Sequence, residues 1–540
     1  MKKYVFLPLV FLTFNVCAQQ KAELVVFNAK VYTVDNNFST ATAIAVNDGK
    51  IVEVGSSAAL QKKYKAAKSL DAKGNYIFPG FIDAHAHFLE YGLGLNAADL
   101  VGTKSWNEII DRLKIYASSH KEGWIVGNGW DQNDWADKNF PDNAQLNILF
   151  PDRPVILSRV DGHAAIANDK ALEISHILAG DTLIGGTVEV KNGKLTGILV
   201  DNATGLVYKN VPNPSLPQII SALLAAQKNC FAAGLTTIDD CGENYMTALL
   251  MKSLQDSKKL KMRLFVMLSD RKENYEYLFA KGKIKTDRMN ISSFKVFADG
   301  ALGSRGACLL SPYSDRAGWE GFLLSSQAHF DSVANIIYDH GFQMCTHAIG
   351  DSANRTILKI YDKYLKGKND RRWRIEHSQV INENDFHYFK NNSIVPSVQP
   401  THATSDMYWA GDRLGKERLK NAYANQRLLK QNGWLPLGTD FPVEDISPIK
   451  TFYAAVFRKD ANNFPPNGFQ KENALTREQA IRGMTIWAAK SNFEENEKGS
   501  IEKGKFADFI LLDTDLLKAP ENQILKTKVL ATYVNGEKVF

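Results

Sequence analysis

The chain has 540 residues, of which 44% are hydrophobic and 23% are charged, and its formal net charge is +6. This length predicts a large barrel or several domains rather than one small core. The net charge is small for this length, and no block of lysine and arginine is long enough for a nucleic-acid surface. Beyond the N-terminus, no apolar run reaches the ~18 residues that cross a membrane. The composition therefore argues against a nucleic-acid partner and against a membrane span.

Residues 1–18 have the organisation of a secretory signal peptide. Lys2 and Lys3 precede a short apolar stretch, and Val16-Cys17-Ala18 offers small residues for cleavage. The alternative is a lipoprotein anchored through Cys17, but valine at position 16 fits that processing poorly. We therefore expect an exported protein, in the periplasm, whose mature chain begins at Gln19.

The remaining cysteines show no metal-binding or disulfide pattern. Four of them follow residue 18, which is too few for a disulfide scaffold in so long a chain, and they lack the close spacing of a metal site. We expect them to be buried free thiols. They are Cys230, Cys241, Cys308 and Cys345.

Both ends of the chain alternate apolar and polar residues as β-strands do. Tight turns are predicted at Asp48-Gly49 near the start and at Asn535-Gly536 near the end, each between two such strands. Strands this short need partners to be stable. We therefore expect residues 22–78 and 499–540 to meet in one small β-sandwich domain, with residues 79–498 inserted between them.

The central residues 79–498 alternate strand-like and helix-like segments, which is typical of a parallel sheet. Counting YIFPGFIDAHAH, which ends at His87, as the first strand gives eight strands, so the pattern predicts a (β/α)8 TIM-like barrel. Residues 96–230 are too long for one crossover helix and are expected to hold a subdomain inserted after strand one. The other strand-like segments are residues 235–241, 263–269, 292–300, 341–348, 373–378, 393–400 and 434–440.

The segment WIVGNGWDQNDW, at residues 124–135, is aromatic and rich in glycine. Such a loop can line a substrate pocket, and Trp130 is then a candidate substrate contact. The same composition also suits a loop that simply packs on the protein surface. Both interpretations remain open at the level of sequence.

Metal-binding residue types stand at the ends of several strand-like segments. His85 and His87 are two residues apart, so both side chains point to one face of the first strand. His347, His377 and Asp440 close three later segments. TIM barrels build their active sites at the carboxyl ends of the strands, and neutral imidazole is the commonest metal ligand. Each residue alone is compatible with an ordinary hydrogen-bonded role, but their placement in barrel order predicts a metal site.

Seven segments of the chain resemble the metal-dependent amidohydrolase superfamily. The resemblance is strongest to the branch of N-substituted formamide deformylase-like proteins (amidohydrolase family 3 type), which have a large insertion after strand one. It covers nearly the whole mature chain. The segments are GKIVEVG, FPGFIDAHAH, FKVFADGALGSRGA, THAIGD, IEHSQ, GTDFPV and GSIEKGKFADFILLD. The metal ligands that this resemblance implies are His85, His87, Lys295, His347, His377 and Asp440.

Lys295 lies within an apolar strand-like segment, where a charged amine is costly. Beside two dications an ammonium is untenable, because each unit of like charge at ~4 Å costs about 4 kcal/mol at an effective dielectric constant of ~20. The resemblance implies that Lys295 is carboxylated, since a carbamate is an anion whose two oxygens can bridge two metals. The implied cofactors are two divalent metal ions, zinc by first choice, with a single metal as the alternative.

The resemblance implies hydrolysis of a carbon–nitrogen bond in an amide, formamide or N-acyl group by a metal-activated hydroxide. Asp440 is then the catalytic residue that takes the proton of the water and passes it to the leaving nitrogen. The candidate substrate contacts are His163, Arg305, His402 and Trp130.

Two other functions fit the same fold. The same metals can hydrolyse an ester, a lactone or a cyclic amide, and a protein of this fold can bind ligands without turnover. The second alternative is disfavoured because all six implied ligand positions are present. The expected partner is a small-molecule substrate, and a homodimer is the default expectation for the assembly.

Overall fold

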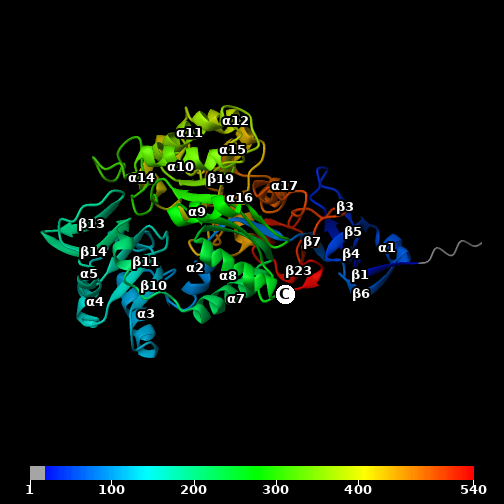
Figure 1. Ribbon diagram of the computed structural model, residues 1–540, viewed down its shortest axis with the longest axis horizontal. Helices are drawn as coiled ribbons and strands as arrows, with labels where there is room; N and C mark the ends of the chain where they lie inside the picture. The colour runs from blue at the N-terminus through cyan, green and yellow to red at the C-terminus, as the bar shows by residue number, and fades with distance from the viewer. Residues whose placement is uncertain (1–18) are drawn as a thin grey trace, which may run out of the picture.

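Figure 1 shows the computed structural model of the chain, which describes residues 19–540. The expected signal peptide, residues 1–18, lies outside the described residues. A barrel surrounded by helices occupies the middle of the molecule. The N-terminal strands lie at one end of the long axis, and a separate sheet from residues 98–201 lies at the other end.

The barrel wall consists of parallel strands in the order β8–β15–β16–β18–β19–β20–β21. Most of their residues are buried, since the barrel interior covers one face and helices cover the other. The short β17 (Ile284–Lys285) pairs antiparallel with β18. The wall strands are β8 (Phe81–Ala86), β15 (Leu235–Glu243), β16 (Arg263–Ser269), β18 (Met289–Phe297), β19 (Gln343–Ala348), β20 (Arg374–His377) and β21 (Val395–Ser397).

The expected eighth strand, at residues 434–440, is not a regular strand. Only Leu437 forms a β-bridge, parallel to Val398. The segment is nevertheless tied to both neighbours, since Gly438 N donates to Val398 O at 3.1 Å and Leu437 O accepts a bond of 3.2 Å from β8. Pro436 has no N–H to donate, which is one reason why the ladder is incomplete here. The irregular segment closes the barrel between β21 and β8.

Helices between the strands cover the outside of the barrel. Helix α7 (Leu216–Ala232) begins with a capping box at Ser215 and buries one face, which includes Leu223 and Phe231. Among residues 19–540, no helix is long and apolar enough to cross a bilayer. The other helices of this region are α2 (Phe88–Gly94), α8 (Tyr245–Asp256), α9 (Lys272–Lys281), α10 (Gln327–Asp339), α11 (Asp351–Leu365), α12 (His387–Asn391), α13 (Pro400–Asp406), α14 (Ala410–Leu419), α15 (Asn425–Asn432), α16 (Pro448–Phe457), α17 (Arg477–Gly483) and α18 (Ile486–Ser491).

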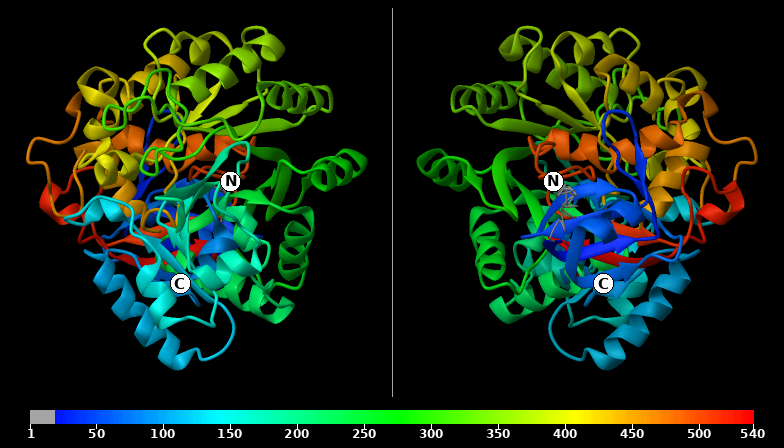
Figure 2. Two further views of the ribbon diagram at one scale, coloured as in Figure 1. Left: turned by 90° about the vertical axis from the view of Figure 1, so that its left-hand side faces the viewer. Right: turned by 90° about the vertical axis from the view of Figure 1, so that its right-hand side faces the viewer.

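Strands from the two ends of the chain pair in one sheet. Strand β7 (Tyr76–Pro79) runs antiparallel to β22 (Phe509–Leu512), in a sheet of order β24–β23–β22–β7–β2–β3. A second sheet, of order β5–β4–β1–β6, shares with it an apolar core that includes Val26 and Phe509. The right-hand view of Figure 2 shows the N-terminal strands beside the C-terminal ones. The remaining elements are β1 (Gln20–Phe27), β2 (Lys30–Tyr32), β3 (Thr40–Ala41), β4 (Ala43–Asn47), β5 (Lys50–Gly55), α1 (Ser57–Lys63), β6 (Tyr64–Asp71), α19 (Glu521–Ile524), β23 (Val529–Val534) and β24 (Glu537–Lys538).

Residues 98–201 form a subdomain between β8 and β15, around a sheet of order β13–β14–β12–β11–β10–β9. Apolar side chains on the sheet belong to two separate clusters, one with Trp130 and Leu157 and the other with Ile156 and Leu199. The subdomain therefore packs around its own cores. Its elements and the helix that follows are β9 (Ala98–Asp99), α3 (Trp106–Ser119), β10 (Ile125–Trp130), α4 (Ala144–Leu149), β11 (Val155–Arg159), β12 (Ala164–Ala167), α5 (Asp169–Ile174), β13 (Gly186–Lys191), β14 (Lys194–Asp201) and α6 (Thr204–Tyr208).

The cysteines among the described residues are free thiols. Cys230, Cys241 and Cys345 are buried, and Cys308 is partly exposed. Burial of free thiols as small apolar side chains agrees with the expectation from the sequence.

Candidate metal centre

The carboxyl ends of the barrel strands converge on one group of histidines. His85 lies on β8 and His347 on β19, and His377 is the last residue of β20. Lys295 lies near the end of β18. Asp440 is the last residue of the irregular segment 434–440, and its backbone N donates to the carbonyl of His85 at 2.8 Å. The group therefore occupies the end of the barrel where active sites of this architecture are built.

The carboxylate of Asp440 lies close to His85 and to His87, the residue directly after β8. Its Oδ1 is 3.3 Å from His87 Nε2 and 3.5 Å from His85 Nε2. His85, His377 and Asp440 offer donor atoms that all lie within 4.8 Å of one another. Oδ1 of Asp440 is buried and receives no well-aligned hydrogen bond from the described residues. A buried carboxylate oxygen without a donor is unfavourable unless a cation meets it, so this arrangement suits a metal ion.

Lys295 and His347 belong to the same group. Lys295 Nζ is 3.0 Å from His85 Nε2. The ring centroid of His377 lies 4.7 Å from that of His85 and 4.5 Å from that of His347. The structure thus brings together all the residues that the sequence suggested as ligands, namely His85, His87, Lys295, His347, His377 and Asp440.

The directions of the pKa shifts of His85, His347, His377 and Asp440 also suit a metal. Burial, followed by the nearby Lys295, lowers the pKa of His85 to about 4. Burial likewise holds the pKa of His347 and that of His377 well below the ordinary value. Burial alone would raise the pKa of Asp440, but His85 and the other nearby imidazoles outweigh it and lower this pKa well below its usual range. Neutral imidazoles and an ionised carboxylate are the donors that zinc and similar divalent ions bind.

His402, one of the expected substrate contacts, holds the outer oxygen of Asp440. Carried on α13, it lies with Nε2 3.2 Å from Asp440 Oδ2 and with Nδ1 3.0 Å from Glu444 Oε1. Burial opposes the charge on this ring, but the two carboxylates outweigh burial and raise the pKa of His402 well above its ordinary value. With Oδ2 in contact with His402, the other carboxylate oxygen, Oδ1, faces His85 and His87.

His163, another expected substrate contact, reaches the group from the inserted subdomain. It lies between β11 and β12, and its ring centroid is 4.9 Å from that of His347. Its Nδ1 is 2.6 Å from Oδ1 of Asp201, the last residue of β14. The inserted subdomain therefore contributes a hydrogen-bonded histidine to the edge of the metal centre.

Comparison with known proteins assigns the family. The Amidohydrolase family matches residues 68–540, which is most of the chain. The chain belongs to the Amidohydrolase family. It is 32% identical to the protein LONG AFTER FAR-RED 3 of Arabidopsis thaliana, over 96% of this chain and 92% of that protein. It is 24% identical to the N-substituted formamide deformylase of Arthrobacter pascens, over 96% of this chain and 98% of that enzyme.

A solved structure supports the same assignment. The crystal structure of an uncharacterized metal-dependent hydrolase from Pyrococcus horikoshii OT3 is 28% identical to this chain, with a TM-score of 0.75. The match covers 92% of this chain and 99% of that one. The predicted family and the predicted TIM-like barrel are therefore confirmed. The chain has the fold of metal-dependent hydrolases.

Asp201 of this amidohydrolase fits against two glycines of the loop after β18. A Cβ on Gly300 would lie 2.3 Å from Oδ2 of Asp201, and a Cβ on Gly306 would lie 2.0 Å from the same oxygen. Only glycine leaves room for the carboxylate at these two positions. The contact explains two of the three glycines in the segment FADGALGSRGA, and it joins the inserted subdomain to the barrel beside His347.

Gly306→Ala is expected to weaken this junction. The added methyl group must displace Asp201 and its bond to His163, so the free energy of unfolding should fall by about 1–3 kcal/mol. Denaturant titration measures the change. Gly205→Ala, in helix α6, is the matched control, because no atom from outside its own helical backbone and its chain neighbours lies within 4 Å of the added Cβ. Equal stability of the two variants would contradict the proposed contact.

Two expected substrate contacts do not join the metal centre. Trp130 is fully buried in the core of the inserted subdomain, where its Nε1 donates to Leu157 O at 2.8 Å. It is a core residue rather than a substrate contact, because the loop turns this indole inward and satisfies its N–H there. Arg305 pairs with Asp315 at 2.9 Å, in the loop after β18. Nearby Asp299 accepts hydrogen bonds from three backbone N–H groups, those of Cys308, Ile349 and Gly350.

Several polar partners of the centre were missed at the level of sequence. Glu376 Oε2 is 2.6 Å from His85 Nδ1, and Gln399 Oε1 is 2.8 Å from His377 Nδ1. Glu376 directly precedes His377, which is the only local signal that could have drawn attention to it. No local sequence pattern marks Asp201 or Glu444, because single acidic residues are common throughout the chain.

Proposed function

We propose that this protein is a metal-dependent amidohydrolase that cleaves a carbon–nitrogen bond in an amide, formamide or N-acyl group of a small molecule. The observation that carries the proposal is the convergence of donor atoms from His85, His377 and Asp440 within 4.8 Å. The formamide deformylase of Arthrobacter pascens, a relative over nearly the whole chain, supports the choice of bond.

We propose that six residues bind two divalent metal ions. Zinc is the first choice, and a single ion is the alternative. A bound metal supplies a Lewis acid that polarises the scissile carbonyl and makes hydroxide available near neutral pH. Lys295 is fully buried, with Nζ 3.0 Å from a proposed metal ligand, His85, and we propose that it carries a carbamate. The six residues are His85, His87, Lys295, His347, His377 and Asp440.

Asp440 is the proposed proton carrier. Its Oδ1 lies among the imidazoles, so this oxygen can take the proton of the attacking water and pass it to the leaving nitrogen. His402 keeps the carboxylate in this orientation through its bond to Oδ2. His163 has its Nδ1 held by Asp201, which leaves Nε2 to contact the substrate.

The metal content of the purified protein and the metal dependence of its turnover test this proposal. Protein purified without chelators is expected to hold about one or two divalent ions per chain, and removing them should abolish turnover until Zn²⁺ is added. A panel of formamides, N-acyl amines, esters and lactones of similar size identifies the bond that is cleaved. Hydrolysis of esters or lactones alone would favour the alternative function. A folded protein that binds no metal would contradict the proposal.

We also propose export to the periplasm and assembly as a homodimer. Export is supported by the positive and apolar residues at 1–18, and the dimer by its frequency among soluble proteins. The mass of the mature protein separates cleavage before Gln19 from lipid attachment at Cys17. Sedimentation of the purified protein tests the dimer.

A further inference from the structure

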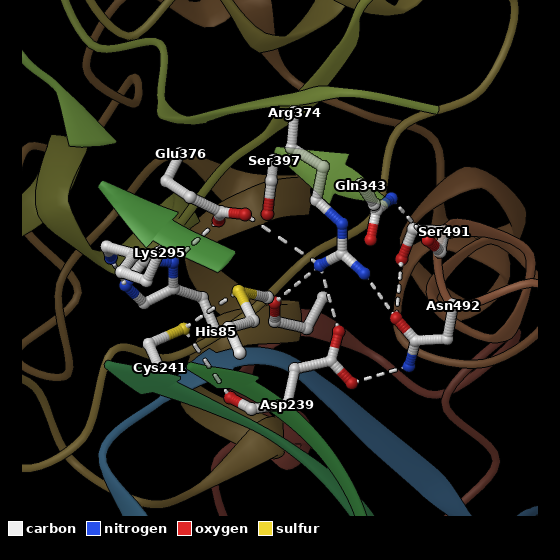
Figure 3. Close-up of polar contacts among 12 residues, drawn as sticks. His85, Asp239, Cys241, Lys295, Gln343, Arg374, Glu376, Ser397, Ser491 and Asn492 are labelled. Carbon is white, nitrogen blue, oxygen red and sulfur yellow. Dashed lines mark hydrogen bonds and ion pairs between the residues drawn. The ribbon is translucent and has the colours of Figure 1, made fainter. Parts of the chain in front are cut away.

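The interior of the barrel below the metal centre is charged, whereas TIM barrels usually fill this space with bulky branched side chains. Figure 3 shows Asp239 of β15 and Arg374 and Glu376 of β20 in this interior. The side chains of all three are fully buried. Asn492, which directly follows α18, joins them. The proposed mechanism assigns no role to this interior cluster of Asp239, Arg374, Glu376 and Asn492.

Glu376 contacts a metal-ligand candidate directly. Its Oε2 lies 2.6 Å from Nδ1 of His85. An ionised carboxylate only accepts hydrogen bonds, so Nδ1 carries the hydrogen and Nε2 keeps its lone pair. Nε2 is the atom that faces Lys295 Nζ at 3.0 Å and Asp440 Oδ1 at 3.5 Å. The contact with Glu376 therefore directs the metal-binding lone pair of His85 into the centre.

Arg374 forms an ion pair with Glu376. Its Nη1 is 2.9 Å from Asp239 Oδ2 and 3.8 Å from Glu376 Oε1, and it donates to Ala84 O at 3.2 Å. Asn492 Nδ2 donates to Asp239 Oδ1 at 2.6 Å, while its Oδ1 accepts from Arg374 Nη2. The guanidinium thus lies between two carboxylates. Arg374, fixed by these hydrogen bonds, places its positive charge 3.8 Å from Oε1 of Glu376, which accepts no hydrogen bond from the described residues.

We propose that Glu376 is a positioning residue of the metal centre, which acts through His85 by setting its tautomer and ring orientation. Asp239, Arg374 and Asn492 keep Glu376 in place. A histidine that binds a metal usually donates its other N–H to such a partner, and loss of the partner lowers metal affinity. The inference rests on the proposed metal-dependent function and extends it to the barrel interior.

Glu376→Gln tests the proposal with little change in size. The amide can donate to Nδ1, which favours the tautomer with its hydrogen on Nε2, where the metal should bind. We expect zinc affinity, measured by competition with a chromophoric chelator, to fall about 10- to 100-fold. The absorption bands of the Co²⁺-loaded protein should shift as well. Glu376→Asp keeps the charge and should recover part of the affinity.

Ser397→Ala is the matched control. Ser397 is the register partner of Glu376 on the neighbouring strand, and its buried Oγ has no hydrogen-bond partner among the described residues. Its removal should leave zinc affinity and the Co²⁺ spectrum unchanged. Asn492→Ala leaves Glu376 intact but loosens Arg374, so it should lower zinc affinity by less than Glu376→Gln does. This variant keeps the proposal testable where Glu376→Gln does not fold.

The outcomes separate the two proposals. If wild-type protein binds no metal, that result contradicts the proposed function itself. If wild-type protein binds zinc and a folded Glu376→Gln matches its affinity and its Co²⁺ spectrum, Glu376 has no positioning role. Where only Asn492→Ala can be purified, wild-type affinity and spectrum in that variant overturn the proposal. A loss of thermal stability with unchanged metal binding would likewise show that the interior cluster serves the fold alone.

Discussion

Lys295→Ala is expected to lower turnover about 10³-fold and to reduce the metal bound per chain. The reason is electrostatic: one unit charge at ~4 Å from a cation contributes about 4 kcal/mol at an effective dielectric constant of ~20, and that energy corresponds to about 10³-fold in rate. The side chain is fully buried, and Nζ lies 3.0 Å from His85 Nε2. If Lys295 carries the proposed carbamate, the substitution would remove a negative charge from beside the bound metal. Metal analysis and a turnover assay measure both effects.

Two further measurements distinguish a carbamate from an ordinary lysine. Small carboxylic acids present the same two oxygens, so adding them to Lys295→Ala should restore part of the turnover. Lys295→Arg should be the least active protein, because a permanent positive charge repels the metals. The expected order is wild type, alanine with added carboxylate, alanine alone, and arginine. An arginine variant that binds two metals and turns over normally would disprove the carbamate.

His377→Ala is expected to abolish detectable turnover, with a loss on the order of 10³-fold or more, while the barrel remains folded. The imidazole offers a donor atom to the same group as His85 and Asp440, so its loss removes a proposed ligand and weakens the Lewis acid. The residue is the last of β20, and its ring lies beside those of His85 and His347 rather than in an apolar layer. Turnover, metal content and circular dichroism together measure the effect.

His120→Ala is the control for this variant. His120 is an exposed residue at the C-terminal end of α3, where its ring stacks on Tyr116 at 4.0 Å. Its removal should change neither turnover nor metal content. Near-wild-type turnover in His377→Ala would show that the proposed ligand set is wrong, and an unfolded variant would contradict the expected independence of the fold.

The positions of the barrel strands follow from local sequence. The expected segment at residues 263–269 coincides with β16 (Arg263–Ser269), and the segment at residues 373–378 contains β20. A strand that is buried on both faces has a short run of apolar residues between turn residues. The sequence of the strand itself is therefore enough to locate it. The segment at residues 434–440 has the same composition, but only Leu437 forms a bridge there. Its place was predictable and its hydrogen bonding was not.

The candidate ligands were also recognisable from sequence, because strand ends in a barrel all face one site. His85, His347 and His377 could be picked from separate segments for this reason alone. No comparable rule predicts the direction in which a loop side chain points. The sequence therefore left the role of Trp130 open, and only the packing of the inserted subdomain showed that its indole lies in a core.

The partners of these ligands were decided by tertiary structure alone. Glu376 and His85 are 291 positions apart in sequence and meet only because the barrel closes. Asp201 reaches the loop after β18 only because the inserted subdomain docks there, against Gly300 and Gly306. Periodicity and spacing report how a residue relates to its own strand or helix. Contacts across the barrel depend on strand register and closure, which no local pattern encodes.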